Sequence, residues 1–417
     1  MSGTNQHIHV HPASAFAPMS ARKNASASSS GVEIVDSADG LAVYQKEIEE
    51  LADFSQDTNT QFEYTTLVSA LKHLQRGKKA RVALIWNFEE GINGRQLIGL
   101  LPFHVPIFQM LLPLKQWSSW QHIHSFISTP LLKSGYEITA VEKYLNAAWA
   151  HGASLVQFPE YQGDGAFDHA LSVVAAQHAL NIRETDIHHR AFLSSGLDSD
   201  SYIATHIRKK KRKEFNRLWN RLSELGTLDF VTHNGGEKAQ GWVDTFLSLE
   251  ASGWKGARGT AMQMRPNEKA YFTEICLGSH RAGKLHCTEM LLDGKPIAML
   301  TSFRAGNGLY TFKIAFDEEY ARYSPGTLLM LKLIHPCLDD PKIDWVDSCA
   351  IPDHPMIDHI WAERRPMRSV IVGRNTISGR ISLSLGAGMM KLQKTAREHL
   401  KTVYYKIRKE MGNGKAD

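Results

Sequence analysis

The chain has 417 residues, of which 43% are hydrophobic and 22% are charged, and its formal net charge is +5. This composition excludes a wholly disordered or fibrous protein, and the length favours two or more domains. No run of about 18 apolar residues occurs, so we expect no spanning helix and a cytoplasmic protein, with peripheral membrane contact as the alternative. The four cysteines form no CxxC pair, so no metal site is expected.

The first 38 residues are rich in Ser, Ala and His and lack periodic apolar positions, which predicts a disordered tail over residues 1–38. Residues 39–205 alternate strand-like and helix-like patterns, and we expect them to form a first lobe. Its expected strands lie at 81–88, 96–103, 120–126 and 154–158, and its expected helices at 138–150 and 164–180.

A basic segment, residues 206–226, follows the first lobe and contains the run RKKKRK. Phe215, Leu218, Leu222 and Leu225 recur on one side of the helix that this segment predicts, so we interpret it as a linker helix. Its cations either form a solvated face or bind nucleic acid. The preceding stretch FLSSGLDSDS (192–201) is interpreted as a loop that connects the lobes.

Residues 227–375 repeat the alternating pattern and predict a second lobe. Its expected strands lie at 228–232, 284–303 (a hairpin), 308–316, 342–348 and 369–373, and its expected helices at 237–253, 266–282 and 355–363. The Asp293-Gly294 pair favours a tight turn within the hairpin. Residues 376–417 predict a loop and a basic amphipathic helix at about 389–411, which rests either on the second lobe or on an anionic membrane.

The two lobes share an order of elements: a hairpin, a third strand, a Ser/Thr-Pro turn, a helix and a buried strand. The turn is STPLLKSG (128–135) in the first lobe and YSPGTLLM (323–330) in the second, and a glycine follows the proline only in the second. We interpret this order as an internal repeat, and two unrelated turns are the alternative.

The second turn has the chemistry of an anion site at a helix start. Pro325 suits the first helical position, and Gly326 lets a ligand approach the backbone closely. The N–H groups that follow are free donors at a helix N-terminus, where an anion is favoured, and Arg322 adds charge. Taken alone, the same residues fit a plain helix start capped by Ser324.

The order of elements from residue 227 onward resembles that of the GNAT acyltransferases, in which coenzyme A pyrophosphate sits on the turn after the fourth strand. Three segments, 208–226, 246–262 and 294–330, resemble the CelD/BcsL-type acetyltransferases associated with polysaccharide biosynthesis, a tandem-GNAT branch distantly similar to FemAB peptidyltransferases. The resemblance covers about 200–375 closely and the first lobe more loosely. One departure is the turn itself: the usual Arg/Gln-x-x-Gly-x-Gly/Ala reads Arg322-Tyr-Ser-Pro-Gly326-Thr here.

The resemblance implies an α/β (α+β) fold of two GNAT-like lobes, each a mixed, mainly antiparallel sheet flanked by helices. It implies an acyl-CoA-dependent N-acyltransferase that uses acetyl-CoA or another acyl-CoA as co-substrate. The acceptor would be an amine between the lobes, on a sugar or polysaccharide precursor. The alternatives are a FemAB-like transferase that uses aminoacyl-tRNA through the basic linker, and a non-catalytic partner of a polysaccharide-synthesis complex.

The resemblance also assigns site residues. The implied donor-binding residues are Ile314, Ala315, Phe316, Arg322, Ser324, Pro325, Gly326, Thr327 and Leu328. Trp254, Lys255 and Lys313 are the implied substrate contacts, with a plain helix end at Gly253 as the alternative for the SGWKG loop. The candidate general bases are Asp317, Glu318, Asp347 and His354, each with a surface ion pair or cap as its alternative. The stretch 349–373 contains no tyrosine, so His354, His359 or a water would protonate the leaving thiolate.

Overall fold

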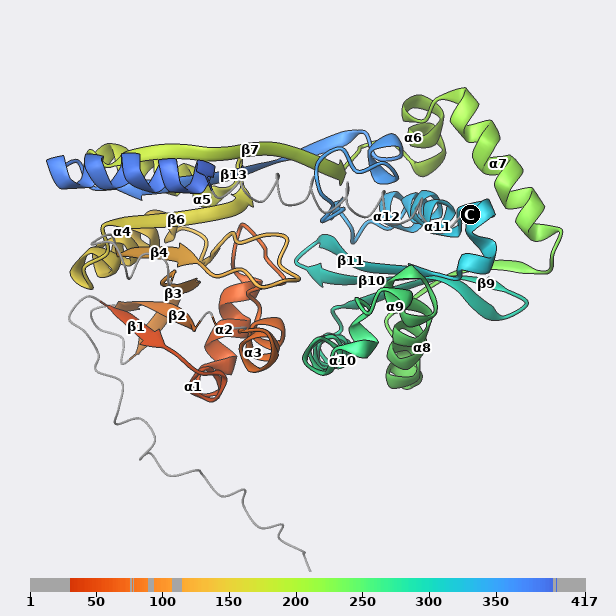
Figure 1. The fold of residues 1–417 in the computed structure, drawn as a ribbon, viewed down its shortest axis with the longest axis horizontal. Helices are drawn as coiled ribbons and strands as arrows, with labels where there is room; N and C mark the ends of the chain where they lie inside the picture. Colours follow the sequence, from red (N-terminus) through yellow and green to blue (C-terminus); the bar gives the residue numbers. More distant parts are fainter. Residues whose placement is uncertain are drawn as a thin grey trace, which may run out of the picture.

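The computed structural model describes residues 31–75, 77, 79–88, 94–106, 115–392 and 395. Two lobes of mixed α/β structure lie next to each other along two long strands that both lobes share (Figure 1). The predicted α/β class with two lobes is therefore confirmed. Within the described ranges, no helix combines the length and the apolar character needed to cross a membrane.

The first lobe is built on strands whose bounds are β1 (Val32–Val35), β2 (Ala80–Phe88), β3 (Arg95–His104), β4 (Gln116–Ser119), β5 (Leu131–Leu132) and β6 (Leu155–Gln162). Its helices are α1 (Ala38–Ala42), α2 (Gln45–Asp53), α3 (Tyr64–His73), α4 (Glu137–Ala150) and α5 (Ala166–Gln177). The chain leaves this lobe through β7 (Asn181–Leu193), α6 (Ser199–His206) and α7 (Lys209–Ser223).

The second lobe contains β8 (Leu228–His233), β9 (Leu285–Leu292), β10 (Lys295–Ala305), β11 (Gly308–Phe316) and β12 (Trp345–Asp347). Its α-helices are α8 (Ala239–Ser252), α9 (Trp254–Ala257), α10 (Pro266–Arg281), α11 (Pro325–Lys332) and α12 (Ile334–Leu338). Short 3-10 helices are η3 (Gly236–Lys238), η4 (Met262–Met264), η5 (Glu318–Tyr323) and η6 (Ile357–His359). The chain returns through β13 (Glu363–Gly373) to a helix over residues 377–392.

One continuous sheet joins the lobes, in the order β1-β2-β3-β4-β6-β13-β7-β12-β11-β10-β9-β8, with β5 beside β3. The strand β13 follows the second lobe in sequence, yet its residues 367–373 pair with β6 of the first lobe. The end of β7, at Phe192 and Leu193, pairs with β12 of the second lobe. The two lobes thus exchange strands. The part of the sheet that lies in each lobe is completed by a strand from the other part of the chain.

Each lobe contains a parallel strand pair whose connection includes a helix. In the first lobe β4 pairs with β6 across α4, and in the second β11 pairs with β12 across α11 and α12. This agreement supports the internal repeat. The first turn differs from its expected role, because β5 lies between Pro130 and the start of α4 at Glu137.

Local chemistry explains the hairpin of β9 and β10. Asp293 and Gly294 both have positive φ, 49° and 76°, which is the conformation that a two-residue type I′ turn requires. The Asp293 carboxylate also accepts the Thr227 N–H at 2.8 Å, which ties the start of β8 to the turn. The predicted tight turn is confirmed.

An apolar core runs across the junction of the lobes. It includes Leu67 and Leu71 of α3 together with Tyr271 and Ile275 of α10. Gly278 permits this approach, because a Cβ atom at that position would lie 2.2 Å from Cγ2 of Thr65. The buried contacts between α3 and α10 therefore hold the lobes in a fixed arrangement.

A buried ion cluster joins the three central strands. Asp347 of β12 is fully buried and accepts from Nη2 of Arg190 in β7 and from Nη1 of Arg365 in β13, both at 2.7 Å. The Arg365 guanidinium also contacts the rings of Phe192 and Trp345, 4.2 and 4.3 Å from their centroids. Burial raises the pKa of Asp347, but the two guanidinium groups outweigh burial and hold that pKa below its ordinary value.

Several predicted elements are wrong or shifted. Residues 32–35, assigned to the disordered tail, form β1, because VEIV pairs with β2, and Ser37 caps α1, which begins at Ala38. Residues 1–30 of that tail lie outside the described residues. Residues 120–126, predicted as a strand, are irregular, and the true strand is β4 just before them. The helix expected at 355–363 is only the 3-10 turn η6. Most of the helix expected at 389–411 lies outside the described residues.

The connecting loop that was predicted at 192–201 is partly wrong as well. Its first two residues, Phe192 and Leu193, end the 13-residue strand β7, and residues 199–206 form α6. Pairing with β13, which is distant in the sequence, stabilises β7 along its length. The local sequence gives little indication of such pairing, so the strand was not predicted.

We expect Asp347→Asn to lower the free energy of unfolding by about 3–5 kcal/mol, because two buried guanidinium groups lose the counter-charge that they share. Urea unfolding at neutral pH measures this change. The control is Asp36→Asn, which removes the ion pair of Asp36 with Lys79, whose side chains are 56% and 64% exposed. That change should cost less than about 1 kcal/mol. Equal effects of the two substitutions would contradict the structural role of Asp347.

Candidate functional site

The strand β11 changes its pairing on both edges at one point. On the β10 side, Thr301 pairs with Lys313 and Ser302 with Thr311, so Phe312 is a bulge residue without a partner. On the β12 side, the parallel ladder ends at Tyr310 and Asp347. Along residues 312–316, the edge of β11 that faces β12 therefore has no strand pairing in the described part of the chain. Bulges of this kind are common beside active sites because they redirect side chains and end strand pairing.

The chain after β12 turns away from β11. The Thr311 hydroxyl donates to the Ser348 carbonyl at 2.6 Å, in place of a further ladder bond. Cys349 then adopts φ 49°, a left-handed conformation that bends the chain. The two parallel strands thus diverge immediately after Asp347, next to the bulge at Phe312.

The turn that leads into α11 has an unusual start. Pro325 occupies the first helical turn as predicted, but Ser324 is left-handed, with φ 53°, and its side chain caps nothing. The alternative of a plain start capped by the Ser324 hydroxyl is therefore wrong. The Ser324 carbonyl accepts the N–H groups of Thr327 and Leu328, at 3.0 and 3.1 Å.

Gly326 is buried in the first turn of α11 and faces β11. A Cβ atom there would lie 3.5 Å from both Ile314 and Phe316, which is ordinary van der Waals contact. In the described part of the chain its N–H has no hydrogen-bond acceptor. An uncapped first turn with an unused N–H suits an anionic group of a ligand.

The SGWKG loop is held firmly against the end of β11. Oε1 of Glu318 accepts the Trp254 N–H at 2.6 Å, and Nζ of Lys255 lies 2.8 Å from the buried Glu250 carboxylate. The other Glu250 oxygen accepts the Met262 N–H at 2.8 Å. Gly256 approaches the Ala251 carbonyl so closely that a Cβ atom would lie 1.7 Å from its oxygen. The loop conformation thus depends on glycine at this position.

A small depression lies between this loop and β11, and we call it the β11 depression. Its lining residues are Leu249, Glu250, Gly253, Trp254, Lys255, Ile314, Ala315, Phe316 and Glu318. Six of them were proposed from the sequence for three roles: Ile314, Ala315 and Phe316 as donor-binding residues, Trp254 and Lys255 as substrate contacts, and Glu318 as a base. The structure therefore brings residues proposed for different roles into one place.

Other predicted site residues lie elsewhere or are already engaged. The Asp347 carboxylate is buried and pairs with Arg190 and Arg365, which hold its pKa below its ordinary value. It is therefore unavailable as a base. Asp317 caps η5 by accepting the Glu319 N–H at 3.1 Å. His354 lies in the loop after β12, where its Nδ1 accepts the Met356 N–H at 3.4 Å.

Arg322 and Lys255 are also engaged. The Arg322 guanidinium lies over the Tyr323 ring, 4.8 Å from its centroid, at the end of η5. Lys255 forms the ion pair with Glu250, so its role as a separate substrate contact requires that pair to open.

Sequence reasoning missed a set of buried polar groups beside Lys313. Burial lowers the pKa of Lys313 from its ordinary value, and the nearby Lys255 ammonium lowers it further, whereas Glu250 and Glu268 oppose this. Glu268 of α10 is 2% exposed and lies 3.0 Å from Nε2 of His124 of the first lobe. The His-x-His signal was present in WQHIHSF, but it was interpreted only as a strand.

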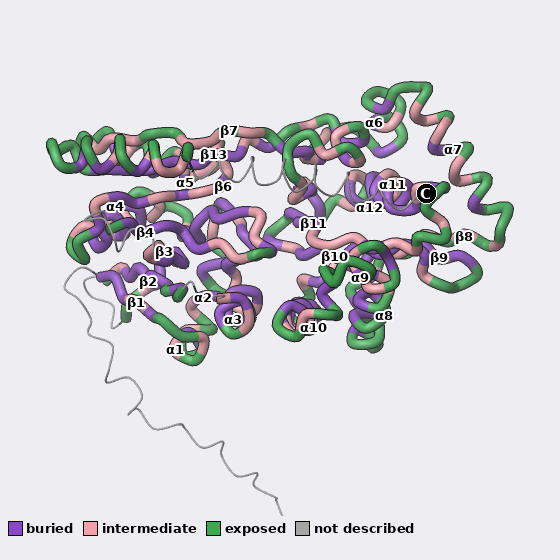
Figure 2. The backbone as a smooth tube through the Cα atoms, viewed as in Figure 1, coloured by how far each residue is buried: buried purple, intermediate pink, exposed green. Residues whose placement is uncertain are grey.

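The basic segment forms α7, and its predicted apolar face is confirmed except at Leu225, which follows the helix and is exposed. Phe215 and Leu222 are buried, whereas most of its lysines and arginines are exposed (Figure 2). The apolar face packs toward η5 and α11, and Nζ of Lys332 in α11 lies over the Trp219 ring at 4.4 Å. The basic face is therefore attached to the elements that surround the first turn of α11.

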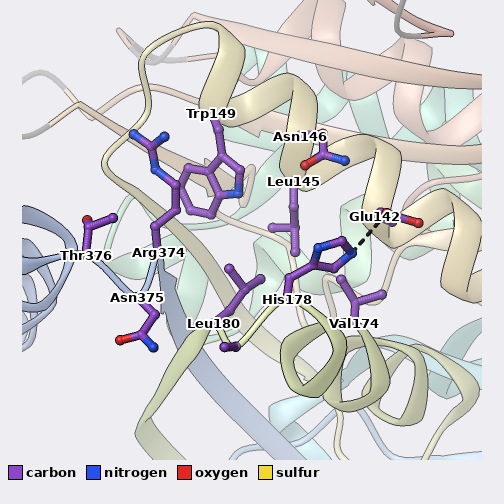
Figure 3. A pocket seen from close by; sticks show the side chains of 11 residues that line it. Glu142, Leu145, Asn146, Trp149, Val174, His178, Leu180, Arg374, Asn375 and Thr376 are labelled. Atoms are coloured by element: carbon purple, nitrogen blue, oxygen red, sulfur yellow. Dashed lines mark ion pairs between the residues drawn. The ribbon is translucent and has the colours of Figure 1, made fainter.

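A separate pocket occurs on the first lobe, between α4, the end of α5 and the chain after β13 (Figure 3). Its walls include Trp149 and Arg374, and an ion pair of His178 with Glu142, 2.9 Å apart, forms one side. None of the residues proposed for the site lines this pocket.

Comparison with known proteins gives three findings. Residues 209–354 match the family described as Acetyltransferase (GNAT) domain. No curated protein matches the chain. Among solved structures, the fold is similar to that of FemX, with a TM-score of 0.51 and 11% identity over 79% of this chain and 95% of that chain. It is also similar to a conserved protein of unknown function from Bacteroides thetaiotaomicron, with a TM-score of 0.50 and 10% identity over 80% and 97%.

We expect Gly256→Ala to destabilise the protein by about 1–3 kcal/mol or to rearrange the SGWKG loop, because its methyl group would overlap the Ala251 carbonyl. The control is Gly241→Ala in α8, where a Cβ atom meets nothing within 4 Å. That change should stabilise the helix by about 0.5–1 kcal/mol. Thermal and urea unfolding measure both. A neutral Gly256→Ala would show that the close approach is not a constraint.

Proposed function

We propose that this chain, whose residues 209–354 match the family described as Acetyltransferase (GNAT) domain, is an acyl-CoA-dependent N-acyltransferase. The donor is acetyl-CoA or another acyl-CoA, and the acceptor is an amine. The observation that carries the proposal is the coincidence of three features: the divergence of β11 from β12, the bulge at Phe312 and the uncapped first turn of α11.

The donor would bind along the free edge of β11. Its pyrophosphate would accept the Gly326 N–H at the start of α11, where the helix dipole favours negative charge. Its pantetheine arm would continue the sheet beside residues 312–316, with backbone groups of that edge as hydrogen-bond partners. The thioester would then end near the bulge, next to the β11 depression.

In the reaction, the amine nitrogen of the acceptor attacks the thioester carbonyl carbon. The C–N bond forms, the C–S bond breaks and coenzyme A leaves as a thiolate that takes up a proton. The attacking nitrogen loses the proton that an ammonium group carries, so a base must accept it. Backbone N–H groups of Ile314 to Phe316 would stabilise the charge on the carbonyl oxygen.

Glu318 is the best-supported base. It is the one of the four candidate bases that lines the β11 depression, and it is bound through Oε1 to the Trp254 N–H, so its position is fixed. The remaining oxygen would accept the proton. We extend the proposal to an acceptor that is an amino sugar or polysaccharide precursor, on the resemblance to CelD/BcsL-type proteins.

A second candidate function is supported by α7. Six exposed or half-buried cations, Lys209 to Lys213 and Arg217, lie on a helix packed toward η5 and α11. A nucleic acid that contacts this face would place its end near the first turn of α11. An aminoacyl-tRNA would then replace acyl-CoA as the donor, while the rest of the site stays the same.

Acetyl-CoA should raise the melting temperature, because a ligand at 100 times its Kd stabilises the native state by about 2.7 kcal/mol. Gly326→Asp should abolish this shift by placing a carboxylate where the pyrophosphate binds. Gly326→Ala is the matched control, since its methyl group would make only ordinary contacts with Ile314 and Phe316. The absence of a shift with any acyl-CoA would count against the proposal.

The same purified protein distinguishes the two donors. A tRNA donor predicts binding that weakens steeply with salt and is lost when Lys209 to Lys213 are replaced by glutamine. If that variant keeps the rise in melting temperature with acetyl-CoA, and the wild type does not bind tRNA, the hypothesis of an acyl-CoA donor is favoured.

Glu318→Gln should reduce kcat for transfer to an amine by about 10²- to 10⁴-fold, the usual contribution of a general base. Coenzyme A release measures the rate, and the acetyl-CoA melting shift checks that donor binding persists. Glu319→Gln, at the exposed neighbouring position, is the control and should leave kcat unchanged. A similar kcat for the wild type and Glu318→Gln would exclude Glu318 as the base.

A further inference from the structure

A helix over residues 377–392 follows β13 and packs on the first lobe (the blue helix in Figure 1). The sequence assigned residues 376–388 to a loop, so most of this helix was not predicted. Its inner side lies close to β6, because a Cβ atom at Gly386 would lie 2.6 Å from Cδ1 of Leu155. Ser382, one turn before Gly386 on the same side, is 6% exposed. The side of the helix that faces the sheet thus contains small residues.

The outward side of the same helix carries large apolar side chains (Figure 2). Four of them are exposed: Ile377 (82%), Ile381 (55%), Leu385 (53%) and Leu392 (70%). Their spacing of four, four and seven residues places them on one face, which we call the apolar stripe. A surface helix normally turns its large apolar residues toward the core, and this helix does the reverse. An exposed face of this kind marks a surface that another apolar phase covers.

The charges beside the apolar stripe have one sign. Within residues 374–392 the charged side chains are Arg374, Arg380 and Lys391, and no Asp or Glu occurs. All three cations are exposed. This combination is complementary to an anionic lipid surface, whose acyl boundary accepts the apolar side chains while its headgroups neutralise the cations.

The other possible occupants satisfy only half of this surface. A nucleic acid would neutralise the cations but would leave the apolar stripe in water. A second copy of the chain, docked stripe to stripe about a two-fold axis, would bury the apolar residues but would bring the cations of both helices together. The charge pattern therefore favours a lipid bilayer over both.

The pocket of Trp149 lies at the start of the apolar stripe (Figure 3). Arg374 and Thr376 line this pocket, and Ile377 follows Thr376 directly. The Arg374 guanidinium lies 5.7 Å from the centroid of the half-buried Trp149 ring. Trp and Arg are common at the level of lipid headgroups, because each joins an apolar body to a polar end. The pocket thus continues the chemistry of the stripe beyond the helix.

We propose that the helix of residues 377–392 docks the protein on an anionic lipid bilayer. The apolar stripe enters the boundary between headgroups and acyl chains, and Arg374, Arg380 and Lys391 pair with lipid phosphates. The contact is peripheral and lies on the first lobe. It goes beyond the proposed acyl transfer and does not depend on it, because the β11 depression belongs to the second lobe.

Sedimentation of the full chain with lipid vesicles tests the proposal. The wild type should partition about ten- to hundredfold more strongly onto phosphatidylcholine vesicles that contain about 30% phosphatidylglycerol than onto phosphatidylcholine alone. Ile381→Ser combined with Leu385→Ser should lower partitioning onto the anionic vesicles by at least about tenfold. The matched control is Val43→Ser combined with Phe54→Ser, both 57% exposed and outside the stripe. It should stay within about twofold of the wild type.

A second pair of substitutions separates the charge from the apolar stripe. Arg374→Gln combined with Lys391→Gln should lower partitioning onto the anionic vesicles by about tenfold and leave that onto phosphatidylcholine unchanged. All these side chains are exposed, so the melting temperature of each variant should match that of the wild type.

Three results would overturn the proposal. The first is a wild type that binds neither vesicle or binds both equally. The second is a stripe variant that binds the anionic vesicles as well as the control variant does. The third is a dimer in lipid-free solution that Ile381→Ser with Leu385→Ser dissociates, which would assign the stripe to a contact between copies. The rise in melting temperature with acetyl-CoA tests the acyltransferase function separately in each case.

Discussion

A single buried carboxylate shared by two arginines sets the geometry of the molecule. Asp347, Arg190 and Arg365 come from three neighbouring strands, β12, β7 and β13, and the last two are far apart in the sequence. Burying three ionised groups is unfavourable unless they satisfy one another, so the cluster is stable only when all three strands are in register. It therefore favours one arrangement of the exchanged strands over alternatives in which each lobe closes its own sheet.

The candidate site depends on this constraint. β12 ends at Asp347, whose carboxylate faces the two arginines, and the left-handed Cys349 turns the chain away from β11. The divergence that would admit a donor thus begins directly beside the ion cluster. The same cluster fixes the first-lobe loop, since Arg190 also donates to the Phe126 carbonyl. The unpaired edge of β11 and the loop of the first lobe are thus held relative to each other by one set of charges.

Local signals in the sequence predicted much of the second lobe. Asp293-Gly294 specified a hairpin turn, Pro325-Gly326 specified a helix start, and the WKG motif marked a loop that contacts the end of β11. These features depend on backbone conformations that few residues adopt, so the residues themselves are informative. The residues at the strand exchange were not predictable in this way. Pairing of β13 with β6 joins segments about 200 residues apart, and nothing local distinguishes it from pairing within a lobe.

The site was predicted only in part for a related reason. Asp347 ends a strand, as a base would, and only the fold reveals that two arginines cover it. Conversely, His122 and His124 lie in a segment whose alternation of apolar and polar residues is typical of a strand. Their contacts with Glu268 and Tyr271 arise from the docking of two lobes, which single-chain periodicity does not encode.

The most direct test of the account is a crystal structure of the protein with coenzyme A. The account predicts the pyrophosphate within hydrogen-bond distance of the Gly326 N–H and the pantetheine arm along residues 312–316 of β11, with the thiol facing the β11 depression. Coenzyme A bound elsewhere, for example in the Trp149 pocket of the first lobe, with the edge of β11 unchanged, would contradict it.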